Sequence, residues 1–375
     1  MSPLEYALAS GLLRALGIMF GLLPARPDRV VLATARTAAL DGNLLHLHRA
    51  FAKHRPDLTC ITLLEPYGYG VAHRLAYLGR LVRGMYHLRT AALFVVDNAY
   101  LPIHVAPHDP RTTVVQVWHA VGALKRFGHD TASPPSEPER TFLHRHYDYV
   151  VAASEASRVA WSAAFRTPVE RVLALGAPRT DFFFDPVAVA AACERLRAAY
   201  PVLVRRRVVL YAPTFRGRGR SKRPAAGFDP VQVREALGPD VAIVLKSHPN
   251  LDPALVPTQG FDVVADPHSE MNDWLALADV LVTDYSSSIL EYSLLRRPIV
   301  LLVDDLAQYE ADPGLYVDYR TEMIGTQVFD TDGVIAAIRD GRVDVDSYES
   351  FIERHLGASD GHASERFVKR FAPRA

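Results

Sequence analysis

The sequence predicts an α/β fold built from two doubly wound, Rossmann-like domains. Short apolar runs typical of buried parallel strands alternate with helical patterns through most of the 375 residues. This length suits two domains of ordinary size, and two prolines, Pro178 and Pro186, mark the expected boundary. Polar residues follow several of the apolar runs directly, at the strand ends where sheets of this kind bind ligands.

The expected strands form two sets of five, one for each domain. Two such domains facing a central cleft define the GT-B fold, which is therefore the predicted fold class. We expect an N-terminal domain at residues 1–180, a C-terminal domain at 187–355 and a helical tail at 356–375. The expected strands are Arg29–Thr34, Leu58–Leu64, Ala92–Val96, Thr113–Trp118 and Tyr149–Ala153, then Arg207–Ala212, Val241–Lys246, Asp262–Ala265, Val280–Thr283 and Ile299–Val303.

Composition and charge narrow the classes of function. Hydrophobic residues make up 49% and charged residues 22% of the chain, as in globular rather than disordered proteins. The 42 basic residues are balanced by 42 acidic ones, which argues against a nucleic-acid partner because nucleic-acid binders usually carry a basic excess. Cys60 and Cys193 lie far apart in the sequence and form no metal or disulfide pattern, which favours a reducing compartment.

Two segments near the N-terminus have the composition of helices that lie on a membrane. The first segment, at about residues 4–23, contains an almost wholly apolar run from Tyr6 to Leu23 that includes Arg14. This run is slightly short for the roughly 20 residues that span a bilayer. Residues 71–88 repeat apolar side chains at helical spacing and carry basic side chains without an acid, as an interfacial helix does against anionic lipid. We expect both segments to contact an anionic membrane surface. Core, interdomain or sheet-covering helices are the alternative, and a true span of the first segment is disfavoured.

The segment from Val280 to Glu291 combines a strand, a polar turn and the start of a helix. The first N–H groups of a helix have no partner within the helix, and the helix dipole adds positive potential there, so such a turn suits a phosphate. Ser286, Ser287 and Ser288 add hydroxyl donors, and Glu291 lies about one turn deeper, where it would accept hydrogen bonds from sugar hydroxyls. The pattern fits a nucleotide; the alternative is that the serines merely cap the helix.

A histidine follows the expected strand at Thr113–Trp118, within the segment WHAVGALKRFG. Its pKa near neutrality suits His119 to general-base work at a strand end. Lys125 would neutralise a phosphate, and Trp118 precedes the histidine directly. A purely structural histidine is the alternative.

Further cationic residues follow two strands of the second set. Thr214 and Arg216 come after the strand that ends at Ala212, and the arginine fork suits bidentate binding of a phosphate. Lys246 and His248 occupy the end of the next strand. A surface salt bridge is the alternative for Arg216, and a hydrogen-bonded loop position is the alternative for His248. With the serine turn, these residues predict one cationic cradle.

The ordered motifs WHAVGALKRFG, YAPTFR, LKSHP, DWLALADVLVTDYSSSILEY and GLYVDY resemble the CDP-glycerol glycerophosphotransferase family, whose members build teichoic acids and capsule polymers. The resemblance runs from about Ala92 to the C-terminus, where DGHASERFVKRF also resembles the family's tail. It implies a peripheral enzyme with a GT-B fold on the cytoplasmic face of the cell membrane. Ala120 departs from the family's usual glycine, and Glu291 stands near where the family usually has aspartate.

This resemblance implies that the chain transfers glycerol phosphate, or a related alditol phosphate, from a CDP-alditol to a hydroxyl of a lipid-linked acceptor and releases CMP. The implied N-terminal domain serves the acceptor and the C-terminal domain the donor. No cofactor or metal is expected, and Asp344-Val345-Asp346, which resembles a metal-binding pattern, lies outside any strand end. The implied roles are catalysis for His119 and His248, donor binding for Arg216, Thr214, Lys246, Asp284, Ser286, Ser287, Ser288 and Glu291, and acceptor or phosphate binding for Lys125 and Trp118.

Other readings of the sequence stay open at this point. A GT-B glycosyltransferase or a sugar-nucleotide epimerase would share the fold and a carboxylate that grips ribose. A membrane-bound scaffold with a vestigial nucleotide site is a non-enzymatic alternative. The sequence does not distinguish glycerol from ribitol phosphate, a primase from a polymerase, or one oligomeric state from another.

Overall fold

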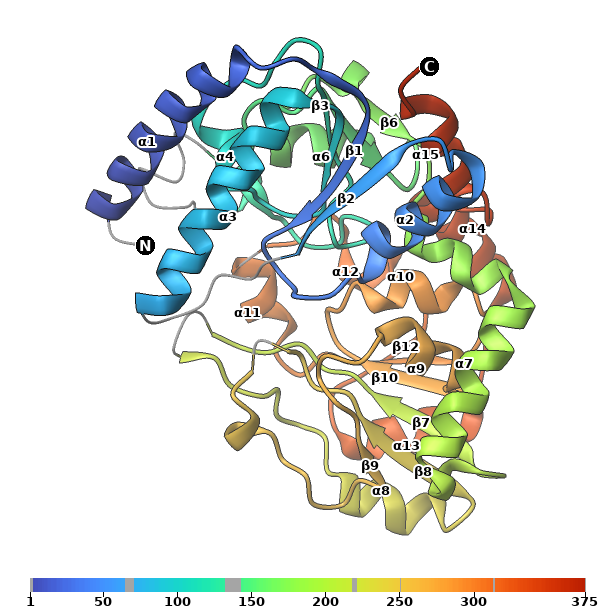
Figure 1. The fold of residues 1–375 in the computed structure, drawn as a ribbon. Coiled ribbons are helices and arrows are strands. Elements are labelled where there is room, and N and C mark those ends of the chain that lie inside the picture. Colours follow the sequence, from blue (N-terminus) through green and yellow to red (C-terminus); the bar gives the residue numbers. More distant parts are fainter. Residues whose placement is uncertain are drawn as a thin grey trace. The chain divides into compact units, whose positions relative to one another are not determined.

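The computed structural model describes residues 3–64, 71–131, 143–217, 221–249, 251–312 and 314–374 (Figure 1). The chain divides into two compact units. Unit 1 comprises residues 1–181 and 354–375, and unit 2 comprises residues 182–353. Each unit contains a six-stranded parallel sheet. The C-terminal segment, which we expected as a separate tail, clusters with unit 1.

The sheet of unit 1 has the strand order β2-β1-β3-β4-β5-β6. The first strand therefore lies inside the sheet, and the chain reverses its direction of travel across the sheet between β1 and β3, as in doubly wound folds. The five strands expected here are present, and β6 is additional; with only three residues, it leaves a weak pattern in the sequence. The strands are β1 (Arg26–Thr34), β2 (Thr59–Leu64), β3 (Ala91–Val96), β4 (Thr113–Gln116), β5 (Tyr149–Ala152) and β6 (Val172–Ala174).

Helices from distant parts of the chain complete unit 1 (Figure 1). The last helix, α15, packs against α2, where the rings of Phe367 and Phe51 meet edge to face at 6.4 Å. Both side chains belong to the hydrophobic core that includes residues of β1, β3 and β4. The α-helices are α1 (Pro3–Gly21), α2 (Gly42–His54), α3 (Val71–Thr90), α4 (Leu101–Val105), α6 (Arg158–Phe165) and α15 (Ala363–Phe371).

The two N-terminal segments singled out by composition are both helices, α1 and α3, and they pack against each other. Phe20 and Tyr86 meet edge to face at 5.6 Å, and a Cβ at Gly17 would lie 3.2 Å from the sulfur of Met85. The small residue therefore lets the helices approach closely. Among the described residues, no helix combines the length and the hydropathy that crossing a bilayer requires.

The sheet of unit 2 has the strand order β12-β11-β10-β7-β8-β9. Its first strand, β7, lies between β8 and β10, so the strand order reverses between β7 and β10. The five strands expected here are present, and the three-residue β12 is additional. The strands are β7 (Arg207–Tyr211), β8 (Val241–Leu245), β9 (Val263–Val264), β10 (Val280–Thr283), β11 (Ile299–Leu302) and β12 (Thr326–Val328).

Several helices of unit 2 begin at aspartates that cap them. The Asp185 and Asp229 carboxylates each accept hydrogen bonds from two N–H groups of the first turn, and a proline follows each. Asp344 accepts hydrogen bonds from the backbone N–H and the hydroxyl of Ser347, so the aspartates that resemble a metal pattern stand at a helix start. The α-helices are α7 (Pro186–Ala199), α8 (Pro230–Leu237), α9 (Met271–Leu277), α10 (Ser288–Ser293), α11 (Leu306–Ala311), α12 (Tyr319–Glu322), α13 (Thr331–Asp340) and α14 (Val345–Leu356), which crosses the unit boundary.

The packing of α15 predicts that the C-terminal helix stabilises unit 1. Phe367 is fully buried, so Phe367→Ala should lower the free energy of unfolding by about 3–5 kcal/mol. The control Lys369→Ala removes an exposed side chain of the same helix and should change it by about 0.5 kcal/mol at most. Urea unfolding followed by tryptophan fluorescence measures both, because Trp118 and Trp161 lie in unit 1. Equal midpoints for the two variants would contradict the prediction.

Candidate active site

The polar residues predicted for donor binding gather at one edge of the unit 2 sheet. Strands β10, β7 and β8 are neighbours and run parallel, so the residues that follow them emerge at the same edge. Asp284 follows β10, Thr214 and Arg216 follow β7, and Lys246 and His248 follow β8. The reversal of strand order between β7 and β10 therefore coincides with this cluster.

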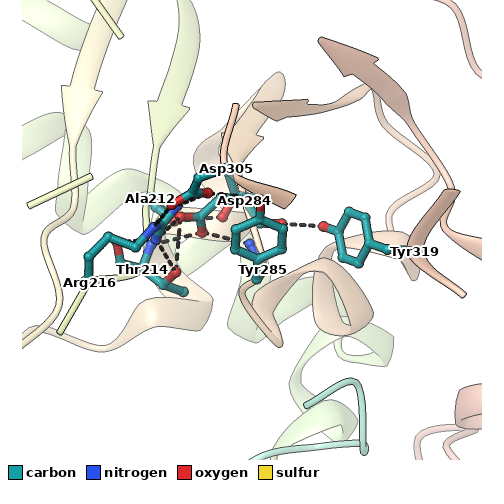
Figure 2. A network of polar contacts seen from close by, with 8 residues as sticks. Ala212, Thr214, Arg216, Asp284, Tyr285, Asp305 and Tyr319 are labelled. Carbon is teal, nitrogen blue, oxygen red and sulfur yellow. Dashed lines mark hydrogen bonds and ion pairs between the residues drawn. The ribbon is translucent and has the colours of Figure 1, made fainter. Parts of the chain in front are cut away.

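Arg216 lies at the centre of this edge and makes ion pairs with two aspartates (Figure 2). Its Nη1 atom lies 2.8 Å from Asp284 Oδ2, and its Nε and Nη2 atoms donate to the two carboxylate oxygens of Asp305 at 2.5 and 3.0 Å. The Arg216 side chain is only 11% exposed. All three of its nitrogens are thus bound to carboxylates of the same unit.

Asp284 organises the backbone around it. Its Oδ1 atom accepts hydrogen bonds from the N–H groups of Thr214 at 2.9 Å and Tyr285 at 2.7 Å. Its Oδ2 atom accepts from the Thr214 hydroxyl at 2.9 Å as well as from Arg216. Four donors on one buried carboxylate fix the end of β7 against the turn after β10, so Asp284 holds this turn in position.

Three tyrosines support the same network. The rings of Tyr285 and Tyr309 stack at 3.8 Å, and the Arg216 guanidinium lies 5.2 and 5.3 Å from their centroids. The Tyr285 hydroxyl donates to Asp305 at 3.0 Å, and the Tyr319 hydroxyl donates to the main-chain oxygen of Asp284 (Figure 2).

Sequence reasoning missed two members of this network, although signals for both were present. Asp305 follows the apolar strand at Ile299–Val303, in the same position that marked the other polar residues. Tyr319 is the last residue of the motif GLYVDY. Because the Arg216 fork is used inside unit 2, the contacts give Arg216 a positioning role, and its direct contact with a phosphate stays a prediction.

The serine turn leaves backbone donors available. Ser286 Oγ accepts hydrogen bonds from the N–H of Ser288 at 3.2 Å and from its hydroxyl at 2.8 Å. The N–H groups of Ser286 and Ser287 have no hydrogen-bond partner in the part of the chain that the structure describes. Both serines are partly exposed, so these two N–H groups suit the predicted role as donors to a phosphate. Glu291, predicted to approach the ribose, is 3% exposed on α10.

The two cationic residues after β8 differ in their surroundings. Lys246 is 6% exposed, and its ammonium donates to the carbonyl oxygens of Asp266 at 2.9 Å and Pro267 at 2.7 Å. Burial lowers the pKa of Lys246 to about 8. His248 is half-buried, with its ring edge to face against Phe215 at 4.9 Å. Lys246 thus stabilises the neighbouring loop at Asp266 and Pro267, while His248 lies nearer to solvent.

In unit 1, backbone contacts define the tautomer of His119. Its Nδ1 atom lies 3.3 Å from the main-chain oxygen of Asp97. A carbonyl oxygen only accepts, so we assign the proton to Nδ1, which places the lone pair of the neutral ring on Nε2. Trp118 packs beside this ring at 4.3 Å and stacks on Phe127 at 5.2 Å. Lys125 is half-buried in the same segment.

Other side chains hold the 118–119 segment in place. The Asn43 amide donates to the carbonyl oxygens of Val117 at 3.2 Å and Trp118 at 2.9 Å. The Arg179 guanidinium donates to the carbonyl oxygen of His119 at 3.3 Å, and the Gln116 side chain accepts from the N–H of Trp118 at 2.8 Å. These contacts stabilise Trp118 with a φ of 51°, which is unfavourable for a residue with a Cβ.

Asp97 is a further polar residue beside His119 that sequence reasoning missed. It follows β3 directly, as the other site residues follow their strands, and it is 1% exposed. Burial raises the pKa of its carboxyl to about 6, while Arg36, 3.8 Å away, acts in the opposite direction. Within the described residues, its Oδ1 atom has no hydrogen-bond partner.

The ion pairs of Arg216 predict a large loss of stability on its removal. Arg216→Ala should lower the free energy of unfolding by about 3–5 kcal/mol, because it leaves the buried carboxylate of Asp284 without its cation. Arg195→Ala is the control: its ion pair with Asp273 is largely exposed and is worth about 1 kcal/mol or less. Urea unfolding followed by circular dichroism compares the two variants. A loss for Arg216→Ala no larger than that of the control would contradict the positioning role.

Comparisons with known proteins agree with the motifs and the fold. Residues 17–372 match the family described as CDP-glycerol:poly(glycerophosphate) glycerophosphotransferase. The teichoic acid ribitol-phosphate primase of Bacillus spizizenii is 32% identical over 367 residues, covering 94% of each chain. The teichoic acid glycerol-phosphate primase of Bacillus subtilis is 26% identical over 77% of this chain and 75% of that protein.

Solved structures give the fold independently. The wall teichoic acid polymerase TagF superimposes with a TM-score of 0.76 over 98% of this chain and 95% of that chain, at 18% identity. A UDP-GlcNAc 2-epimerase from Neisseria meningitidis matches less well, with a TM-score of 0.54 at 14% identity. The similarity to TagF confirms the GT-B fold class predicted from the sequence. The chain therefore belongs to the CDP-glycerol:poly(glycerophosphate) glycerophosphotransferase family.

Proposed function

We propose that the protein transfers an alditol phosphate from a CDP-alditol to a hydroxyl of a lipid-linked acceptor, releasing CMP, in the synthesis of teichoic acid or a capsule-type polymer. The observation that carries this proposal is the family match across residues 17–372, which includes every strand-end motif of the two units. The polar groups that the reaction needs are present at those strand ends.

Ribitol phosphate is the alditol phosphate that the relatives favour. The ribitol-phosphate primase shares 32% identity with this chain over 94% of both, whereas the glycerol-phosphate primase shares 26% over about three quarters of both. CDP-ribitol is therefore the first donor to test, with CDP-glycerol beside it.

We assign activation of the acceptor to unit 1. The acceptor hydroxyl attacks the phosphorus that bears the alditol while His119 Nε2 takes the hydroxyl proton, since Nδ1 is bound to the carbonyl oxygen of Asp97. A bond forms between the acceptor oxygen and this phosphorus, and the bond from phosphorus to the bridging oxygen of CMP breaks. The proton on His119 then passes to solvent, which restores the base.

We assign donor binding to unit 2. As CMP leaves, negative charge grows on its phosphate, and oriented dipoles and cations stabilise such charge in phosphoryl transfer. The N–H groups of Ser286 and Ser287 and the ring of His248 are suited to this task, and Glu291 is assigned to the ribose. Arg216 and Lys246 support them by holding the turn and a neighbouring loop. These groups need no metal ion in the proposed reaction.

We propose that α1 attaches the enzyme to a membrane, on its cytoplasmic face. One side of the helix packs inward through Ser10, Leu13 and Gly17. The opposite side is also apolar, where a solvent-facing helix would carry charges. A helix with an apolar outer face suits the boundary between lipid headgroups and acyl chains. The strongly exposed apolar residues of this helix and of the two residues after it are Leu4, Leu8, Leu12, Ile18, Met19, Leu22 and Leu23.

Helix α3 carries less positive charge at pH 7 than its count of basic residues indicates. Burial, together with the nearby Arg29 and Arg83 charges, lowers the pKa of His87 to about 4, so this histidine is neutral at pH 7. Attraction to anionic lipid therefore depends on the arginines of α3 and of the adjoining segments.

The reaction is tested by measuring CMP release from CDP-ribitol and CDP-glycerol on a lipid-linked acceptor, with UDP-sugars alongside. We expect CMP and a product heavier by one or more alditol phosphates, at a rate that EDTA does not change. His119→Gln should slow transfer by at least 100-fold, as expected for loss of a general base. His54→Gln, which changes an exposed histidine of α2, serves as the matched control. UDP release would identify a glycosyltransferase instead. An undiminished rate for His119→Gln would remove it as the base, and product length separates a primase from a polymerase.

Membrane attachment is tested by sedimentation with vesicles of phosphatidylglycerol and phosphatidylcholine. Leu8 and Ile18 are 67% and 74% exposed on α1, so the double variant Leu8→Glu/Ile18→Glu should lower partitioning at least tenfold. The matched control is Val159→Glu/Val187→Glu, which changes valines exposed to a similar extent on α6 and α7. Equal partitioning of the two double variants would contradict attachment through α1.

A further inference from the structure

Unit 1 contains a cavity of about 800 Å³ whose walls are strongly basic. Its volume lies within the range of about 300–1,000 Å³ that is usual for small-molecule sites. The described lining residues include three arginines and three histidines and no acid. These six are Arg145, Arg166, Arg171, His129, His144 and His146.

Two of these arginines have unused hydrogen-bonding capacity. In the part of the chain that the structure describes, the guanidinium groups of Arg166 and Arg171 make no hydrogen bond and no ion pair. The acid that Arg171 influences at longer range is Asp148, whose carboxylate is held by His108 at 2.9 Å. The guanidinium group of Arg158, by contrast, donates hydrogen bonds to the Glu155 carboxylate and to two main-chain carbonyl oxygens. Two forked donors therefore face this cavity with no partner among the described residues.

Two of the three histidines, His144 and His146, add no positive charge to the cavity at pH 7. Burial, then the neighbouring histidines, holds the pKa of His144 well below its usual value. Burial, with His108 and Arg145, also lowers the pKa of His146. Both rings are neutral at pH 7 and add N–H donors, while the arginines supply positive charge throughout the neutral range.

The walls of the cavity hold an unusual backbone conformation. His144, His146 and Arg166 have φ values of 55°, 62° and 50°, in the left-handed region that costs a residue with a Cβ about 1 kcal/mol or more. Packing compensates for this cost. The His144 ring lies edge to face against Phe165 at 4.7 Å, and its Nδ1 lies 3.1 Å from the hydroxyl of Tyr147. Such a wall is preformed, which reduces the entropy lost on binding.

One aromatic side chain connects the cavity to the proposed base. The ring of Trp118 lies 4.3 Å from that of His119 and 5.6 Å from that of His144, centroid to centroid. The wall of the cavity is therefore separated from His119 by a single indole. A group bound in the cavity would lie on the acceptor side of the reaction, since the donor residues belong to unit 2.

We propose that this cavity binds a phosphate of the acceptor, either the diphosphate of a lipid-linked acceptor or a phosphodiester of the polymer. Unpaired arginine forks match phosphate oxygens bidentately, and neutral imidazole N–H groups complete the hydrogen bonds. The identification of the occupant as the acceptor rests on the proposed function. The anion-binding property rests on the cavity and its arginines alone.

Calorimetric titration of the full chain tests anion binding directly. Inorganic pyrophosphate stands for the lipid diphosphate and bis-glycerol phosphate for the polymer phosphodiester, and saturating CMP is present to occupy the nucleotide site. Arg166→Gln/Arg171→Gln should weaken binding of one or both probes at least tenfold. Arg49→Gln/Lys53→Gln, which removes the same charge from exposed positions of α2, should leave binding within twofold. The probe that loses affinity identifies the source of the phosphate.

The proposal is overturned if the wild type binds neither probe saturably, or if both double variants bind as the wild type does. Steady-state kinetics then test the identity of the occupant. Arg166→Gln/Arg171→Gln should raise the KM for the acceptor at least tenfold and leave the KM for the CDP-alditol within twofold. An unchanged acceptor KM would assign the cavity to another phosphate. Failure of the wild type to release CMP from any donor would refute the proposed function, and the calorimetric result would stand by itself.

Discussion

The edge of unit 2 predicted to bind the donor depends on one largely buried interaction, the ion pairs of Arg216 with Asp284 and Asp305. These residues follow three strands, β7, β10 and β11, so the interaction ties three strand ends together. Burying the charges of Arg216 and Asp284 is costly, and the cost is offset here because the guanidinium fork and the donors around Asp284 satisfy them. The serine turn begins at Ser286, directly after Tyr285 of this network, so the network also determines where the turn lies.

The ion pairs of Arg216 could not be predicted from the sequence, although the position of Arg216 after a strand could. A polar residue after an apolar strand is correctly placed at the carboxyl edge of the sheet, as Thr214, Arg216 and Asp284 were. Whether its side chain binds a ligand or a neighbour depends on residues far away in the sequence. Asp305 lies 89 residues from Arg216, so no local pattern connects them. The sequence therefore located the arginine and left its partner undetermined.

The fold was easier to predict than the contacts of the site, because each buried strand appears in the sequence as a local run of apolar residues. Runs of four or more apolar residues predicted strands such as β3 and β8, whose residues are almost wholly buried. Strands β6 and β12 have three residues each and were not predicted. The return of α15 to unit 1 depends on a long-range contact between Phe367 and Phe51. The cavity of unit 1 could not be predicted either, because its arginines and histidines come from segments that are separate in the sequence.

The two units use their cations in different ways, and this difference constrains the chemistry. In unit 2, Arg216 and Lys246 are bound to carboxylates and carbonyl oxygens of the same unit. In the proposed reaction, stabilisation of the departing phosphate then falls to the fixed N–H groups of the serine turn and to His248. Dipoles held in place before the reaction need no reorganisation as charge develops. In unit 1, the guanidinium groups of Arg166 and Arg171 have no partner among the described residues, as the proposed capture and release of an acceptor phosphate requires.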